Sequence, residues 1–293
     1  MTLEQLRAFV AIADTGSLSG AADKIRRTQP AVSVSLKELE LELGTILVER
    51  RRAGALLTHE GQEFLQHVRQ ALAILDSARQ KVAGGGTAPV RIVIATTDTL
   101  ATYRLPAVIA RFSKRFPKVS VLIHSKQSRA AAEMVAGGVA DVGFLPFEAI
   151  SGGLNAIEIG RTRELFVQSS QGTLFRGRKM ISVQQLSAMP LIMLSADTMT
   201  RQVLEKIFGQ AGASIQTATE AISIEVIKAI VKSGLGCSLL PDIAVEEERK
   251  AGLLLATTVK EIAPRPWGGC VRKSAARNDP VDALLEISRH AGR

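Results

Sequence analysis

The chain has 293 residues, enough for two domains, and 46% of its residues are hydrophobic, which is ample for packed cores. It contains neither an apolar run of membrane-spanning length nor a secretory signal at its N-terminus, so a cytoplasmic protein without a membrane partner is expected. The net charge of +9 suggests an anionic partner, but residues 1–89 hold eleven Lys and Arg against ten Asp and Glu, so local basic clusters are more informative than the total.

The N-terminal stretch predicts three helices, of which the last two are joined by a tight turn. Thr2 and Gln5 can form a capping box for the first helix, which ends near Gly16. Ser17 is a candidate N-cap for the second helix and Thr28 for the third.

The third helix divides into two faces when it is rotated at about 100° per residue. The face expected to pack consists of Val32, Leu36, Leu39 and Leu43. The opposite face consists of Pro30, Ser33, Val34 and Lys37. Because a helix of this diameter fits the major groove of B-DNA, the pair predicts a helix-turn-helix. An ordinary helical hairpin with a solvated polar face is the alternative.

Residues 46–57 predict a small two-stranded wing. Three adjacent arginines, Arg50, Arg51 and Arg52, stand at its tip, where they can contact phosphates. Three exposed arginines are also common on a solvated surface. Their position beside a helix-turn-helix favours phosphate contact.

A longer helix then begins after Thr58 and continues to Val82. Its apolar residues alternate at intervals of four and three, a narrow seam typical of a helix that pairs with another helix: Gly61, Leu65, Val68, Leu72 and Leu75. This pattern predicts a homodimer, which suits DNA readers that bind two half-sites. The alternative is an amphipathic helix lying on its own domain. Residues 84–89 predict a hinge.

From residue 90, apolar strand patterns alternate with helical patterns, which predicts two linked α/β lobes with largely parallel sheets. A strand over 267–272 and a closing helix over 279–290 are expected to return to the first lobe, giving two crossovers. Such lobes bind ligands at the carboxyl ends of their strands.

Polar residues recur at these strand ends. The candidates for a ligand site are Thr97, Asp98, Thr99, Lys126, Gln127, Ser128, Ser195 and Thr198. Together they could surround a small anion, although each hydroxyl could equally be a simple helix cap. Asp98 would repel an anion unless it pairs with Lys126 or unless the ligand carries an amine or a hydroxyl.

Motifs for catalysis or metal binding are not found. The chain has no G-x-S-x-G elbow, Walker loop or Rossmann glycine triplet, and its histidines lack metal-ligand spacing. We therefore expect neither an enzyme nor a bound cofactor or metal. Cys237 and Cys270 stand among apolar or small residues and are expected to be buried inert thiols, with a redox sensor as a minor alternative.

The order of these parts resembles the LysR-type transcriptional regulators over essentially the whole chain. The N-terminal resemblance is specific and rests on Leu6-Arg7-Ala8-Phe9, Gly16-Ser17-Leu18, Ala21-Ala22, Gln29 to Ser33, Leu39-Glu40, Leu43-Gly44, Arg50, Leu57-Thr58 and Gly61. The C-terminal resemblance is looser and rests on Leu105-Pro106, Phe116-Pro117, Gly138 to Asp141 and Val231 to Pro241.

This resemblance implies a fold of three parts: an α+β winged helix-turn-helix, a linker helix, and a two-lobed α/β effector domain like that of periplasmic binding proteins. The domains would span 1–58, 59–86 and 87–293. Within the last, lobe I would take about 90–161 and 267–293, and lobe II about 162–266. A linker-helix dimer, often assembled into a tetramer, is also implied.

Together, residues and resemblance assign ten DNA contacts: Arg27, Thr28, Gln29, Pro30, Ser33, Val34, Lys37, Arg50, Arg51 and Arg52. Val34 departs from the family, which often has arginine or another polar residue there, so an apolar contact with a thymine methyl is expected instead. The resemblance also points to Thr97, Thr99, Gln127 and Ser195 around the effector, and implies that Thr96 faces the sheet.

The sequence thus predicts a transcription regulator that binds inverted-repeat DNA and responds to a small, anionic effector. The alternatives are an effector-independent DNA-binding protein and an α/β solute-binding protein with a helical appendage.

Overall fold

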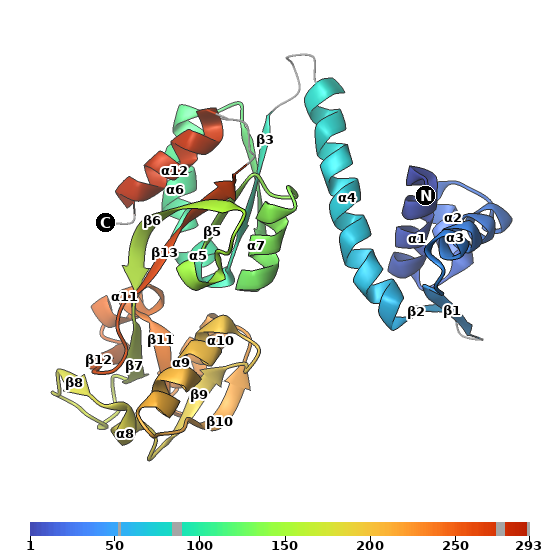
Figure 1. The fold of residues 1–293 in the computed structure, drawn as a ribbon. Helices are drawn as coiled ribbons and strands as arrows, with labels where there is room; N and C mark the ends of the chain where they lie inside the picture. The colour runs from blue at the N-terminus through green and yellow to red at the C-terminus, as the bar shows by residue number, and fades with distance from the viewer. Residues whose placement is uncertain (52–53, 84–89, 274–278, 292–293) are drawn as a thin grey trace. The chain divides into compact units, whose positions relative to one another are not determined.

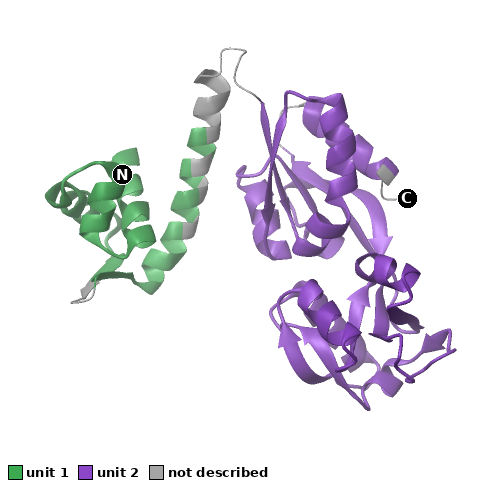
Figure 2. Ribbon diagram, turned by 180° about the vertical axis from the view of Figure 1, so that it is seen from behind, with its two compact units in different colours: residues 1–89 green, residues 90–293 purple. Residues whose placement is uncertain are grey.

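The computed structural model describes residues 1–51, 54–83, 90–273 and 279–291. The chain divides into two compact units, residues 1–89 and 90–293 (Figure 2). Unit 1 contains α1 (Leu3–Thr15), α2 (Leu18–Ile25), α3 (Gln29–Leu43), β1 (Val48–Arg51), β2 (Gly54–Leu57) and α4 (His59–Ala83), as labelled in Figure 1.

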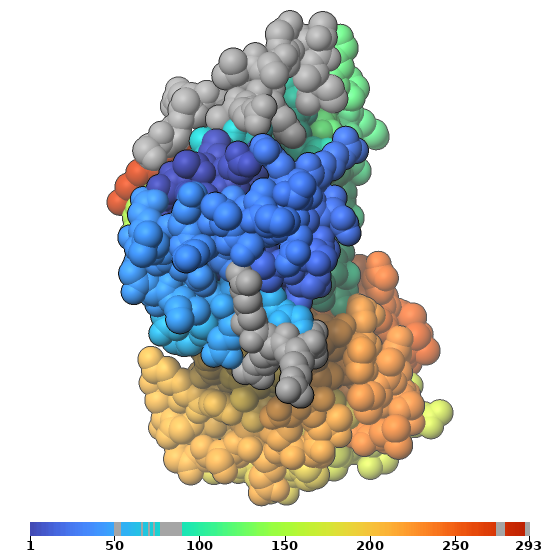
Figure 3. All heavy atoms as spheres, turned by 90° about the vertical axis from the view of Figure 1, so that its right-hand side faces the viewer, coloured from blue at the N-terminus to red at the C-terminus, as the bar shows by residue number. Residues whose placement is uncertain are grey.

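The helices of unit 1 begin and end where the local sequence predicts. Thr2 and Gln5 form a capping box at the start of α1, and the left-handed backbone at Gly16 ends this helix. Ser17 accepts a hydrogen bond from the backbone N–H of Gly20 and so caps α2. In Figure 3 the N-terminal helices appear as blue spheres that form a continuous surface.

One core fills unit 1. Phe9 and Ile12 of α1, Ala21 of α2, and Leu36 and Leu39 of α3 are all buried in it. Val32 is buried as well, whereas Leu43, predicted on the same face, is 37% exposed because it lies in the last turn of α3, beyond the core.

The wing is an antiparallel pair in which Val48 lies opposite Leu57. Two contacts fix it to the helices: the N–H of Ala55 donates to the carbonyl of Gly16 at 2.7 Å, and Glu40 Oε1 accepts from the N–H groups of Leu47 and Val48 at 2.8 and 3.1 Å. Glu40 therefore sets the position of the wing relative to α3.

Unit 2 contains two sheets. The first has the strand order β4-β3-β5-β13-β6, and we call it, with its helices, lobe I. Its elements are β3 (Arg91–Thr96), α5 (Asp98–Tyr103), α6 (Leu105–Arg115), β4 (Ser120–Ser125), α7 (Ser128–Ala136), β5 (Val142–Pro146), the 3-10 turn η1 (Phe147–Ala149), β6 (Leu154–Thr162), β13 (Arg265–Arg272) and α12 (Asp279–Ala291).

The second sheet has the order β10-β9-β11-β7-β12-β8 and forms lobe II. Its elements are β7 (Glu164–Ser169), β8 (Met180–Ile181), α8 (Val183–Leu186), β9 (Pro190–Leu194), α9 (Met199–Gln210), β10 (Gln216–Ala221), α10 (Ile224–Lys232), β11 (Cys237–Pro241), α11 (Asp242–Lys250) and β12 (Leu254–Val259).

The chain crosses between the lobes twice, from β6 to β7 and from β12 back to β13 (Figure 1). The predicted fold class is confirmed, but the expectation of largely parallel sheets is wrong in one respect. The strands that follow a crossover, β7 and β13, pair antiparallel with both of their neighbours, because each enters its sheet from the other lobe.

Among the described residues, no helix is both long and apolar enough to cross a membrane.

Candidate nucleic-acid interface and ligand pocket

One face of α3 is exposed to solvent at its N-terminal end. Thr28 caps the helix by accepting a hydrogen bond from the N–H of Ala31 at 3.4 Å. Gln29, Pro30 and Lys37 are exposed, and Val34 is 55% exposed, which is unusual for valine. Ser33 is half-buried and makes an interaction of its own.

This exposed face lies opposite the buried side chains of α3, so the helix can present it to a partner without disturbing the core. Hydroxyl and amide groups at the start of the helix can bond to base edges or phosphates, and the methyl groups of Val34 can contact a thymine methyl. The arrangement is that of a recognition helix in a winged helix-turn-helix.

Of the four arginines predicted to contact DNA, the structure describes the side chain of Arg27 alone. Arg27 is exposed and forms an ion pair with Glu4 of α1 at 2.9 Å. Arg50 and Arg51 belong to β1, but their side chains lie outside the described part of the structure, as does all of Arg52.

The linker helix α4 packs on its own unit over the first half of its apolar seam. Phe64 of α4 contacts Phe9 of α1 with ring centroids 5.6 Å apart, and Val68 is buried in the core of unit 1. Further along α4, Ile74 and Leu75 are 39% and 41% exposed. The first half of the helix therefore lies on its own domain, and pairing of the remainder with a second copy stays a prediction.

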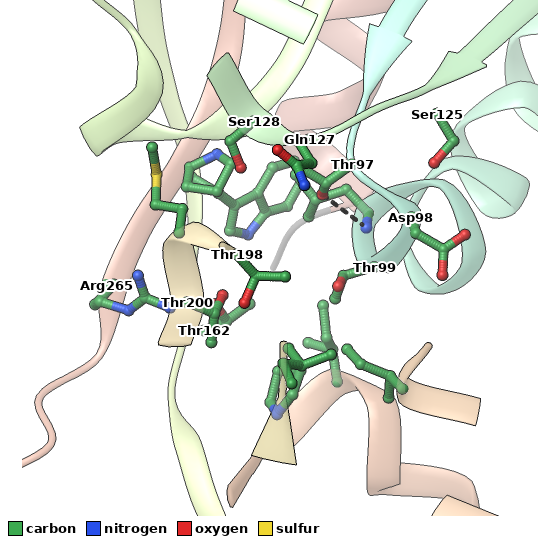
Figure 4. A pocket seen from close by; sticks show the side chains of 18 of the residues that line it. Thr97, Asp98, Thr99, Ser125, Gln127, Ser128, Thr162, Thr198, Thr200 and Arg265 are labelled. Carbon is green, nitrogen blue, oxygen red and sulfur yellow. Dashed lines mark hydrogen bonds between the residues drawn. The ribbon is translucent and has the colours of Figure 1, made fainter. Parts of the chain in front are cut away.

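A cavity of about 470 Å³ lies between the two lobes of unit 2 (Figure 4). Seven of the eight predicted effector residues line it: Thr97, Asp98, Thr99, Lys126, Gln127, Ser128 and Thr198. They come from the carboxyl ends of β3 and β4 in lobe I and from the start of α9 in lobe II, as expected for ligand sites in such sheets.

Ser195 is not among the residues that line the pocket, and this part of the prediction needs correction. Its backbone N–H donates to the carbonyl of Ala221 at 3.1 Å. Its own carbonyl accepts from both the N–H and the hydroxyl of Thr198, at 3.0 and 2.8 Å. Ser195 thus holds the loop that places Thr198. Thr96 is also turned away, since its hydroxyl donates to the carbonyl of Phe144 at 2.8 Å inside lobe I.

Both capped and uncapped helix starts lie at this pocket. Thr97 caps α5, and Thr198 caps α9. By contrast, α7 and α10 each begin without a side-chain cap, at Gln127 and Ser223 respectively. Each helix has nine residues, and the two belong to opposite lobes. Uncapped N–H groups at helix starts favour an anion, and Lys126 adds a positive charge beside them.

The lobes are joined by hydrogen bonds at the pocket and beside it. Gln127 of lobe I donates from Nε2 to Asp197 Oδ2 of lobe II at 2.6 Å. The hydroxyl of Tyr103, on α5, donates to Glu225 of α10. These contacts hold the lobes together around the cavity.

Asp98 is exposed, and Figure 4 shows its carboxylate directed away from Gln127 and Thr198. Among the described residues no ion pair links it to Lys126.

Sequence reasoning missed the residues contributed by the crossover strands. Thr162, Glu164, Arg265, Pro266 and Trp267 line the same cavity. They lie at the end of β6 and at the starts of β7 and β13. β6 has no continuous apolar run, and the crossovers can only be located once the pairing of the sheets is known, so no local pattern indicated these residues.

Arg265 and Glu164 form a buried ion pair in this group, with Nη2 and Oε1 2.5 Å apart. Burial alone would lower the pKa of Arg265, but Glu164 and then Glu148, at 3.5 Å, outweigh burial and raise that pKa above its usual value. Arg265 therefore stays charged.

A winged helix-turn-helix in one unit and a two-lobed α/β ligand pocket in the other define a class of DNA-binding proteins that carry a separate ligand-binding module. Two family models match the chain: residues 3–62 match the bacterial regulatory helix-turn-helix protein of the LysR family, and residues 86–293 match the LysR substrate-binding domain. The chain therefore belongs to the LysR family of transcriptional regulators.

Individual relatives agree with this assignment. A probable hydrogen peroxide-inducible genes activator of Mycobacterium avium is 30% identical, covering 98% of this chain and 93% of the relative. A probable RuBisCO transcriptional regulator of Cyanophora paradoxa is 31% identical, covering 86% and 80%.

Solved structures show the same fold. The structure of the LysR family regulator CbnR matches with a TM-score of 0.73 at 19% identity, and the match covers 100% of each chain. The structure of full-length CbnR with its target DNA matches with a TM-score of 0.73 at 21% identity, and this match covers 99% of the present chain and 100% of the CbnR chain. Full-length OxyR from Pseudomonas aeruginosa has a TM-score of 0.68 at 22% identity and covers 99% of this chain and 95% of its own.

Proposed function

We propose that this LysR-type regulator binds specific inverted-repeat DNA through α3 and the wing, and that a small anionic effector in the pocket of unit 2 controls this binding. The observation that carries the effector part is the pocket itself. Residues of both lobes line it, so a ligand bound there contacts lobe I and lobe II together. Such a ligand favours one relative position of the lobes over another, which is the differential affinity that control requires.

The uncapped starts of α7 and α10, together with Lys126, support an anionic ligand. Thr97, Thr99 and Thr198 would supply hydroxyl groups to orient it. In this proposal the protein is a regulator rather than an enzyme, and it acts in the cytoplasm, where its DNA is.

For DNA binding we assign Thr28, Gln29, Pro30, Ser33, Val34 and Lys37 to the recognition face, and Arg27, Arg50, Arg51 and Arg52 to the phosphates. A homodimer would present two such faces to a two-fold symmetric site. Leu75 of the seam on α4 and the neighbouring Ile74, both exposed, would contribute to that dimer. The CbnR complex with its target DNA supports DNA as the partner of this family, and pairing of dimers into a tetramer is part of the proposal.

Peroxide sensing, which the names of some relatives suggest, is not part of this proposal. Cys237 and Cys270 are buried in different lobes, and burial raises the pKa of each thiol to about 11. A thiol with such a pKa is almost entirely protonated at neutral pH and reacts slowly.

The effector assignment can be tested by thermal melting of the full-length chain with a panel of small carboxylates, sulfate, phosphates and amino acids. A ligand present at a hundred times its Kd stabilises the bound domain by about 2.7 kcal/mol, which for a domain of this size raises Tm by roughly 5–10 °C. Thr97→Val should abolish that shift, whereas Thr219→Val, an exposed control on β10 outside the pocket, should retain it.

The second candidate function is DNA binding without an effector, and it is favoured by the hydrogen bonds that already join the lobes at Gln127 and Tyr103. If no compound raises the Tm of a well-folded sample, the result supports DNA binding without an effector. If a shift persists in Thr97→Val, the pocket is not the binding site.

A further inference from the structure

The crossover end of the pocket contains a buried carboxylate that is only half satisfied. Glu164 is 2% exposed. Its Oε1 accepts from Arg265, but its Oε2 has no hydrogen-bond partner among the described residues. Because buried carboxylate oxygens are normally hydrogen-bonded, Oε2 calls for a donor.

The same end of the pocket contains buried donors that lack an acceptor. Arg265 Nε and Nη1 make no hydrogen bond within the described chain, and the carboxylate of Glu148 is 3.5 Å from Nη1, as an ion pair only. Trp267 is 3% exposed, and its indole Nε1 is likewise unpaired there. Glu164, Arg265 and Trp267 all line the cavity. Figure 4 shows Arg265 on the side of the pocket that holds Thr162 and Thr200, opposite Asp98.

The charges at this end restrict what can bind. One positive charge, on Arg265, faces two negative charges, on Glu164 and Glu148, so a carboxylate of the ligand would be repelled. An ammonium group could donate to Glu164 but offers no acceptor to Trp267 or Arg265. A hydroxyl or a primary amide offers both a donor and an acceptor without a charge, and it matches the unpaired atoms.

The pocket also has apolar lining. Leu100 and Pro146 of lobe I and Leu194, Met199 and Ile224 of lobe II line it. A ligand that reaches from the helix starts of α7 and α10 to the crossover strands would place an apolar body against these side chains.

We propose that the effector carries, besides its anionic group, an uncharged hydroxyl or primary amide that is recognised by Glu164, Arg265 and Trp267, with an apolar body between the two polar ends. This inference rests on the proposed function and specifies its ligand class. Glu164 and Trp267 are then the residues that determine specificity, because they would be left unpaired by an acid that lacks the second polar group.

The test uses the full-length protein and isothermal titration with two sets of matched acids: benzoate, 4-hydroxybenzoate and 4-carbamoylbenzoate, and hexanoate, 6-hydroxyhexanoate and adipic acid monoamide. A hydroxyl or amide member should bind at least about tenfold more tightly than its parent acid. Trp267→Phe, which leaves the Glu164–Arg265 pair in place, and Glu164→Gln should each reduce this preference to about twofold or less. Glu158→Gln, an exposed carboxylate outside the pocket, should retain it.

The possible results distinguish failure of the second polar group from failure of the anionic effector itself. Parent acids that bind as tightly as their substituted partners, or a preference that survives both variants, would overturn the inference and leave the proposed function standing. A crystal structure of a bound complex in which only water bridges Glu164 and Trp267 would also overturn it. If no member of either set binds to the folded protein, the result counts against the anionic effector itself, and the inference fails with it.

Discussion

The buried lysine Lys228 shows how a single residue ties α10 and α11 together. Its ammonium group lies 2.7 Å from Glu248 and 3.0 Å from Glu225, donates to the carbonyl of Ala244 at 2.9 Å, and lies 5.1 Å from the centre of the Tyr103 ring. Burial acts to lower the pKa of Lys228, but its two carboxylate partners outweigh burial and raise it.

Lys228→Met should therefore be strongly destabilising. It leaves Glu248, which is 13% exposed, with only the more distant Lys232, at 3.9 Å, and breaking a buried pair in this way costs about 3–5 kcal/mol. For a domain of this size that corresponds to a fall in Tm of roughly 6–20 °C. Lys250→Met, which removes the exposed pair with Glu246, should cost less than about 1 kcal/mol. Similar Tm values for the two variants would contradict this account.

Asp14 makes the stability of unit 1 depend on pH. Lys24, at 2.8 Å, and Arg69 of α4 hold the pKa of Asp14 below its usual value. Because the folded pKa is the lower one, this contribution is fully present above the unfolded pKa of about 3.9 and is lost as pH falls through the folded pKa. The difference in Tm between wild type and Asp14→Asn should thus shrink as the pH is lowered from about 5 to 3. A difference that stays constant would exclude Asp14 as its source.

The two cysteines should be unreactive in the folded protein. With the pKa of both thiols raised to about 11 by burial, a thiol reagent such as DTNB should modify neither Cys237 nor Cys270 within minutes at pH 7.5, and both after unfolding. Rapid reaction of either thiol in the native protein would reopen the redox interpretation.

Among the elements, the junction of wing and linker helix depends on a glycine. A Cβ atom at Gly61, in the first turn of α4, would lie 2.1 Å from the backbone oxygen of Leu47. Gly61→Ala should therefore displace the wing and lower the Tm of unit 1. Gly209→Ala offers a matched control, because nothing lies within 4 Å of its Cβ position in α9, and alanine is favoured in a helix by about 0.5–1 kcal/mol. If Gly61→Ala melts like wild type and still binds DNA fully, the close approach has no structural role.

Some helices, strands and pocket residues have local signals in the sequence, and others do not. Helices with caps and periodic apolar faces, such as α1 to α3, were predictable because their signals are local. Strands β6 and β12 were not predictable in this way, because neither contains a long continuous apolar run or a regular alternation of buried and exposed residues. In the pocket, the strand-end hydroxyls of Thr97 and Thr198 were predictable from the strand-then-helix order. Glu164, Arg265 and Trp267 were not, because only the antiparallel entry of β7 and β13 brings them there.

At the scale of the whole molecule, the chain forms two units, each with its own hydrophobic core. The core of unit 1 contains residues from Leu6 to Val68, and the cores of unit 2 begin at Ile92. In our proposal the first unit reads DNA and the second binds the effector, and dimerisation through α4 makes the reading symmetric. The connection at 84–89 lies outside the described residues.

The most direct measurement of the central claim is the affinity of the full-length protein for a DNA site enriched from a random pool, compared with scrambled DNA at the same salt concentration. The account predicts an inverted repeat bound at least about a thousandfold more tightly than scrambled sequence. Gln29→Ala should reduce this ratio by weakening the enriched site by about 1–3 kcal/mol. Gln210→Ala, an exposed residue at the end of α9, should leave the ratio unchanged. Equal affinity of the wild-type protein for enriched and scrambled DNA over a range of salt concentrations would contradict a sequence-specific regulator.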